Sequence, residues 1–320
     1  MGKEILEGCK ILLHTCGAVK ENEKVLVVTD ETSRQIGEAM YQCAVEYTDA
    51  TLICTKDRTT HGEAPTDCVA AAMAQADVIF SATTFSLYNT DARIKACEKG
   101  ARFINMADYS LDMLKKGCLF TDWEEIRKLV DRTAKKIVGK ELRITTPAGT
   151  DFWTSIEGRH ADVGYGTSIH KGEASSPPDA ECAVGPVEDT ARGVLVIDGS
   201  IPLPGLGIIK EPIRIEVEDG YLRKIEGGEE ADILRKSLEA FQDPRVYLAA
   251  EVGFGLNPAA CLSGRMLEDE GVFGTMHIGI GNNLSYGGNC NTPIHIDLIM
   301  KKPTCIVDGH YVYKDGVLCE

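Results

Sequence analysis

Two histidines and a carboxylate near the end of the chain have spacings that suit metal binding. His295 and Asp297 are two residues apart in an apolar run, so an extended strand would present both side chains on one face. His277 lies in a second strand-like run, where its side chain would point away from its apolar neighbours. Two histidines and one carboxylate match the open, three-ligand pattern of catalytic zinc and non-haem iron. A cluster of hydrogen-bonded core side chains is the alternative interpretation.

Two glutamates are candidates to complete this site. Glu251 stands alone in an apolar, glycine-flanked run, where a carboxylate is seldom buried unless it is paired or bound to a metal. Glu181 has a similar but weaker context, because Glu188 and Asp189 lie nearby and the stretch could equally be surface. Each of the two glutamates could be a further ligand, a metal bridge, or the base that takes a proton from metal-bound water.

Other features near these residues give weaker indications. The glycines at 279, 281, 287 and 288 would permit close approach of the backbone around the histidines. Arg159 is a possible carboxylate-binding arginine, with a solvated loop as the alternative. No serine or cysteine has the Gly-x-Ser-x-Gly context of a serine hydrolase.

The elements that must position these residues form two predicted domains, 1–138 and 139–320. In the first, continuous apolar strands alternate with helices, which is typical of a parallel sheet covered on both faces. The expected elements are strand 24–30, helix 32–46, strand 50–54, helix 66–75, strand 76–81, helix 89–99 and strand 101–106. Gly100 is a predicted C-terminal helix cap. Because no Gly-x-Gly-x-x-Gly motif follows the first strand, a dinucleotide site has little support.

The second predicted domain is α+β, with a mainly antiparallel sheet that carries the metal site. Residues 213–218 and 221–225 predict a hairpin around the turn Asp219-Gly220. Residues 229–241 have the apolar spacing of an amphipathic helix.

Composition narrows the classes of partner. The net charge of −15 disfavours nucleic acid and anionic membrane surfaces. No segment approaches the roughly 20 apolar residues that cross a bilayer. The 12 cysteines include no Cys-x-x-Cys pair, which favours reduced thiols in a cytoplasmic protein. We therefore expect no nucleic-acid or membrane partner and a cytoplasmic location.

Four motifs in combination resemble the aminopeptidase T family of metallopeptidases, a lineage that includes the 2,5-dihydroxypyridine 5,6-dioxygenases. The motifs are Pro186-Val187-Glu188-Asp189-x-x-x-Gly193, Glu251-Val252-Gly253-x-Gly255-x-Asn257-Pro258, Gly274-Thr275-x-His277-x-x-x-Gly281-x-Asn283 and His295-x-Asp297. The resemblance covers most of residues 140–320. For the peptidases it implies a pair of divalent ions held by Glu181, Glu251, His277, His295 and Asp297, with Tyr286 beside them. For the dioxygenase relatives it implies a single Fe(II) held by two histidines and an aspartate.

These observations lead to three functional hypotheses. The first is a metal-dependent hydrolase of aminopeptidase type, in which zinc, cobalt or manganese activates water and Glu181, Glu251 and Tyr286 are catalytic. The second is a mononuclear Fe(II) ring-cleaving dioxygenase acting on a hydroxylated, pyridine-like compound. The third is a non-catalytic protein that binds a small molecule. The expected substrate is a small molecule or short peptide, and the resemblance suggests a homodimer or higher homo-oligomer.

Overall fold

The computed structural model describes residues 2–319, which divide into two compact units. The first unit contains residues up to 124 together with 164–178, and the second contains 125–163 and the residues from 179 onward. The chain therefore crosses between the units at 124/125, 163/164 and 178/179, whereas the sequence suggested one boundary at 138/139. The difference arises because residues 164–178 return to the first unit and add a short strand to its sheet.

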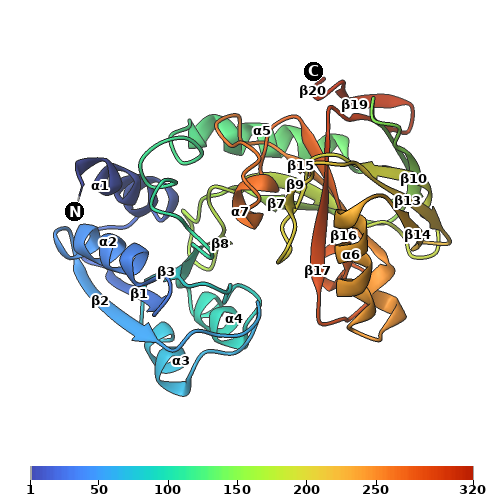
Figure 1. Cartoon of the computed structure of the whole chain (residues 1–320). Helices are drawn as coiled ribbons and strands as arrows, with labels where there is room; N and C mark the ends of the chain where they lie inside the picture. The colour runs from blue at the N-terminus through green and yellow to red at the C-terminus, as the bar shows by residue number, and fades with distance from the viewer. Residues whose placement is uncertain (1, 320) are drawn as a thin grey trace. The chain divides into compact units, whose positions relative to one another are not determined.

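The first unit is built on the predicted parallel sheet (Figure 1). In order across the described sheet, its strands are β2 (Asp49–Thr55), β1 (Lys24–Asp30), β3 (Val78–Ala82), β4 (Arg102–Asn105) and β8 (Ala174–Ser175). Neighbouring strands pair in parallel. The four strands expected in this unit are present. β8 was not expected, because its two residues carry no periodic pattern that a sequence could reveal.

Helices cover both faces of this sheet. They are α1 (Lys3–Lys10), the π-helical turn η1 (Ile11–Cys16), α2 (Arg34–Val45), α3 (Asp67–Met73) and α4 (Asp91–Glu98). On one face, Leu26 and Val28 of β1 join a buried cluster with Val69 of α3. On the other face, Gly37 of α2 packs so closely on Thr29 that a Cβ would lie 2.4 Å from its side chain. The predicted cap after α4 is confirmed, since Gly100 has a φ of +98°.

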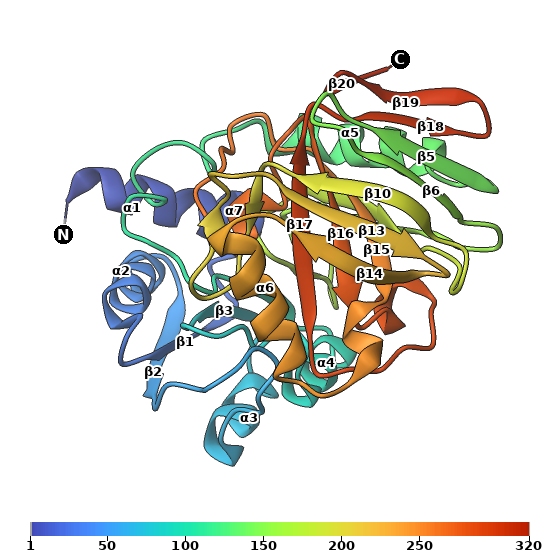
Figure 2. The same cartoon turned by 45° about the vertical axis from the view of Figure 1, so that its right-hand side comes forward.

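The second unit contains two larger antiparallel sheets (Figure 2). The first described sheet runs in the order β14 (Tyr221–Glu226), β13 (Ile213–Glu218), β10 (Arg192–Ile197), β6 (Asp151–Ser155), β5 (Glu141–Thr145), β18 (Thr304–Val307), β19 (His310–Lys314) and β20 (Val317–Leu318). The second runs in the order β17 (His295–Lys301), β16 (Thr275–Gly281), β15 (Ala249–Gly255), β9 (Glu181–Val184) and β7 (Ala161–Gly164). A small ribbon pairs β11 (Ser200–Ile201) with β12 (Gly207–Ile208).

Helices complete the second unit. They are α5 (Trp123–Lys136), which begins two residues before the unit boundary, α6 (Glu229–Glu239), α7 (Met266–Asp269), and the 3₁₀ turns η2 (Pro244–Tyr247) and η3 (Leu284–Tyr286). The predicted hairpin is present: Asp219 and Gly220 have φ angles of +50° and +80°, as a type I′ turn requires. The expected α/β and mainly antiparallel architectures are thus confirmed.

None of the helices within residues 2–319 is both long enough and apolar enough to cross a membrane. The 12 cysteines all lie in this range and are free thiols.

Candidate metal centre

One face of the sheet formed by β15, β16 and β17 carries polar side chains and glycines. In the strand register, Glu251 lies opposite Gly279, and Gly279 lies opposite Asp297. Two residues further along the same pair of strands, His277 lies opposite Gly253. Because directly opposed residues of an antiparallel pair share a face, these carboxylates and the imidazole point to the same side of the sheet.

Apolar residues occupy the opposite face. Val252, Ile278 and Leu298, which alternate with the polar positions, are completely buried in the core. Their burial fixes the register, since a slip of one residue would exchange the two faces of a strand. The alternation predicted around His277 and along His295-x-Asp297 is therefore present in the structure.

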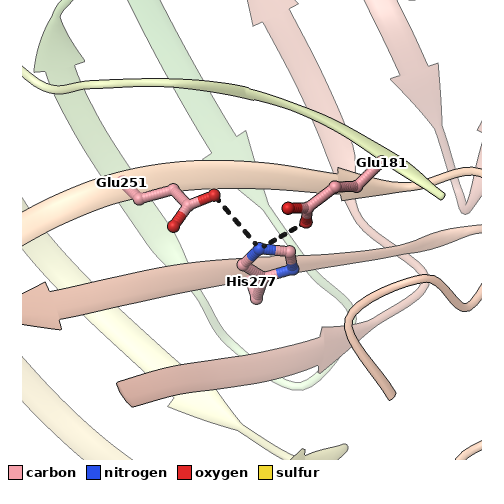
Figure 3. A group of neighbouring side chains, drawn as sticks. All are labelled: Glu181, Glu251 and His277. Atoms are coloured by element: carbon pink, nitrogen blue, oxygen red, sulfur yellow. Dashed lines mark ion pairs between the residues drawn. The ribbon is translucent and has the colours of Figure 1, made fainter. Parts of the chain in front are cut away.

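Five side chains from four strands converge on this face. The Nε2 atom of His277 lies 3.2 Å from Glu181 Oε2 and 3.5 Å from Glu251 Oε1, as Figure 3 shows. The same nitrogen is 3.9 Å from Asp297 Oδ1. The Nε2 atom of His295 lies 2.7 Å from Glu251 Oε2 and 3.5 Å from Asp297 Oδ1. Glu251 thus stands between the two imidazoles and presents one oxygen to each.

Two glycines make room for the convergence. A Cβ on Gly253 would overlap the ring of His277. A Cβ on Gly279 would lie 2.5 Å from His295 Nε2 and 2.8 Å from Glu251 Oε2. Since carbon atoms do not approach side chains this closely, the site requires glycine at both positions, and the imidazoles lie directly over the backbone of β15 and β16.

The carboxylates lack the partners that buried oxygens normally have. Glu181 Oε2, Glu251 Oε1 and Asp297 Oδ1 are buried, and none has a hydrogen-bond partner within residues 2–319. Although burial opposes the charged form of the imidazoles, the carboxylates raise the pKa of both His277 and His295 well above the usual range. In the same way, the two histidines hold the pKa of Asp297 below its usual value despite burial.

This donor set fits a divalent metal ion. The atoms of Glu181, Glu251 and His277 form one group that could hold an ion, and those of Glu251, His295 and Asp297 form a second. Ligands bound about 2.1 Å from one ion lie about 3.0–3.5 Å apart, close to the separations between these donors. A cation would also bind the buried carboxylate oxygens that have no hydrogen-bond partner, which are otherwise costly to bury. Imidazole and carboxylate suit zinc, iron, manganese and cobalt alike.

The ring of His295 is oriented by the backbone. Its Nδ1 atom lies 2.7 Å from the carbonyl oxygen of Asn282. A carbonyl can only accept a hydrogen bond, so Nδ1 carries a proton and donates it, while Nε2 faces the carboxylates. Ligating histidines are commonly held in this way.

Tyr286 lies beside the convergent side chains, as the motif comparison implied. Its ring centre is 5.5 Å from that of His295, and the two ring planes are inclined by 32°. Burial and the neighbouring charges of Glu251 and Glu181 raise the pKa of Tyr286 well above its usual value. The structure thus brings all six predicted residues together, while their roles as ligands or catalysts stay predictions.

Two further carboxyl groups lie at this site and were not predicted from the sequence. Asp179 is buried beside Glu181, and Glu270 approaches Asp297; burial and these neighbouring charges raise the pKa of both well above the usual range. Asp179 could have been found from its place two residues before Glu181. Glu270 ends an acidic run that looks like an ordinary exposed helix end, so it carried no usable signal.

Comparison with known proteins decides the family. The family model described as 2,5-dihydroxypyridine 5,6-dioxygenase matches residues 4–320. The chain belongs to this family. Among curated proteins, it is 31% identical over 206 residues to the 2,5-dihydroxypyridine 5,6-dioxygenase of Pseudomonas putida. That match covers 61% of this chain and 59% of the relative, so it spans less than two thirds of the relative's length.

Two solved structures share the fold of this 2,5-dihydroxypyridine 5,6-dioxygenase family member. The structure of the 2,5-dihydroxypyridine dioxygenase from Pseudomonas putida aligns with a TM-score of 0.83 and 24% identity, covering 98% of this chain and 96% of that one. AmpT from Thermus thermophilus aligns with a TM-score of 0.71 and 14% identity, covering 99% of both chains. At these identities, both comparisons establish the fold alone.

The prediction of an aminopeptidase-type hydrolase is therefore wrong. The descriptions hydrolase, aminopeptidase and metallopeptidase are wrong for the same reason. The family model and the curated relative agree better with the alternative, a dioxygenase. The error has a physical cause. Histidine and carboxylate ligands serve hydrolytic zinc and redox-active iron equally, and a shared fold does not fix the reaction.

Proposed function

We propose that this chain is a metal-dependent dioxygenase that opens the ring of a hydroxylated, pyridine-like compound. The observation that carries the proposal is the convergence of His277, His295 and Asp297 on one glycine-lined face, in a chain of the dioxygenase family. These three side chains are the proposed ligands of one Fe(II). When bound, iron would supply the one-electron chemistry that allows dioxygen to react with an organic ring.

The remaining acidic residues would adjust the charge of the site. Glu251 is 1% exposed and lies against both imidazoles, so it supports an additional ligand role or a role in holding the histidines. Glu181 is more open, with 16% of its side chain exposed. Burial, opposed in part by the neighbouring imidazole of His277, raises the pKa of Glu181 to about 6. A carboxylate that titrates near neutrality is suited to accept a proton from a substrate hydroxyl group.

Exposure indicates the side from which a substrate would approach. The His277 side chain is 1% exposed, whereas 27% of the His295 side chain is accessible. A ring compound would therefore reach the site past His295 and Glu181, with Tyr286 alongside. An aromatic side chain at this position offers a flat apolar surface and a hydroxyl group to a planar substrate.

Oxygen consumption tests the proposal. The purified chain is loaded with Fe(II) without oxygen, mixed with 2,5-dihydroxypyridine or other dihydroxylated pyridines, and then exposed to oxygen. We expect one O₂ consumed per ring opened, and both atoms of ¹⁸O₂ in the product, with no added reductant. His295→Ala is expected to lose this activity, and His310→Ala, at an exposed histidine, is expected to keep it. Substrate binding without uptake across the panel would indicate a non-catalytic binding protein instead.

A further inference from the structure

The loop of residues 282–290 forms the first part of the connection 282–294 between β16 and β17, and a partly buried ion pair holds it in place. Arg159 donates to the carboxylate of Glu188 and also to the backbone oxygen of Gly287. The other carboxylate oxygen of Glu188 accepts from Asn283 Nδ2 at 2.9 Å and from the Asn289 amide at 3.0 Å. Glu188 is thus the common acceptor between the arginine and two positions of the 282–290 loop.

Asn283 transmits this anchoring through the loop. It is almost fully buried, and its Oδ1 accepts from the amide of Cys290 at 2.7 Å. Its backbone oxygen accepts from the amides of Gly288, at 3.0 Å, and of Tyr286, at 3.1 Å. A Cβ on Gly288 would overlap the Asn283 side chain, so the 282–290 loop closes tightly around this one residue.

The 282–290 loop in turn positions two side chains of the candidate metal centre. The carbonyl of Asn282, the residue before Asn283, receives the hydrogen bond from His295 Nδ1. Tyr286 lies in the middle of the loop. Gly185 approaches it so closely that a Cβ on Gly185 would lie 2.6 Å from the backbone oxygen of Tyr286. A movement of the loop would therefore rotate the His295 ring and displace Tyr286 together.

We propose that Arg159 and Glu188 are positioning residues for the metal centre, acting through Asn283 and the 282–290 loop on the orientation of His295. This inference rests on the proposed function, since it concerns the same metal centre. The Arg159 and Glu188 side chains are only 11% and 22% exposed. In an ion pair with so little exposure to solvent, removal of one charge leaves the other charged side chain without its partner. The 282–290 loop then loses the contact that holds it in place.

A metal titration tests the inference. In Glu188→Gln, which keeps the side-chain shape but removes the charge, we expect the Kd for Co(II) to rise about 10–100-fold, the range typical of groups that orient metal ligands. In the Co(II)-loaded protein, the shifted proton resonance of His295 Nδ1–H is expected to exchange faster with solvent. The resonance is assigned by its loss in His295→Gln. Asp151→Asn, which removes the exposed ion pair with Arg143 in the same unit, is the matched control and should change neither value.

The outcomes separate the two proposals. If Glu188→Gln binds Co(II) as the wild type does and its Nδ1–H exchange is unchanged, Glu188 is only a structural residue and the inference is overturned. If Glu188→Gln does not fold, the same two measurements are made on Arg159→Lys. This variant keeps the positive charge but loses the planar guanidinium that donates to both Glu188 and Gly287. If the wild-type chain itself binds no Co(II), both the inference and the proposed metal centre fail.

Discussion

His277 and His295 face the same carboxylates from different surroundings. His277 is enclosed, and its Nδ1 atom has no hydrogen-bond partner within residues 2–319. His295 is partly accessible, and the Asn282 carbonyl fixes its Nδ1 proton. His295 is therefore the more informative position for substitution, because its removal opens no large cavity in the core.

We expect His295→Ala to weaken binding of a divalent ion by more than about 100-fold, since loss of a ligand costs more than loss of a group that only orients one. Competition with a coloured chelator measures this change. His310→Ala replaces an exposed histidine of the same unit and is expected to bind the ion as the wild type does. Equal affinities for the two variants would show that His295 is no ligand.

Metal binding is expected to release protons near neutral pH. The carboxylates raise the pKa of both imidazoles well above the usual value of about 6.5, so the metal-free site holds protons that an ion must displace. Affinity should therefore rise as the pH increases from about 6 to about 8. Calorimetry in buffers of different ionisation enthalpy counts the released protons. Binding without proton release, at an affinity independent of pH, would contradict this electrostatic description.

Among the strands, β15 and β16 need their glycines as much as their candidate ligands, because Gly253 and Gly279 leave room for the two imidazole rings. The period of two predicted that His277 and the pair His295 and Asp297 would face away from the core, and the structure has this alternation. The sequence could not predict which strands pair. The position of Gly253 under the His277 ring depends on the register between segments 24 residues apart, which no local pattern reveals.

Gly253→Ala and Gly279→Ala are expected to abolish metal binding while the sheet remains. The added Cβ would overlap the His277 ring in the first variant and lie 2.5 Å from His295 Nε2 in the second, so each imidazole must move. Metal titration and circular dichroism together measure both effects. In Gly2→Ala the added Cβ meets nothing within 4 Å, which makes that variant the control. Retention of wild-type affinity in either sheet variant would mean that the imidazoles bind from another position.

In the whole molecule, local sequence patterns predicted individual elements, but they did not predict how distant segments pair. The parallel sheet, the Asp219-Gly220 hairpin and helix α6 follow from periodicity and turn residues. Strand β8 does not, because its two residues pair with β4 across about 70 residues of intervening chain, and no local pattern reveals that pairing. The reaction class was also beyond the sequence motifs, since the same histidines and carboxylates are compatible with hydrolysis and with oxygen chemistry.

We propose that a divalent ion binds where β9, β15, β16 and β17 bring their side chains together. Crystals grown without oxygen in the presence of Fe(II), with diffraction recorded on both sides of the iron absorption edge, test it most directly. We predict an anomalous peak about 2.0–2.2 Å from His277 Nε2, His295 Nε2 and an oxygen of Asp297. Iron bound only elsewhere, with no anomalous peak beside these three side chains, would show that they do not form an iron site.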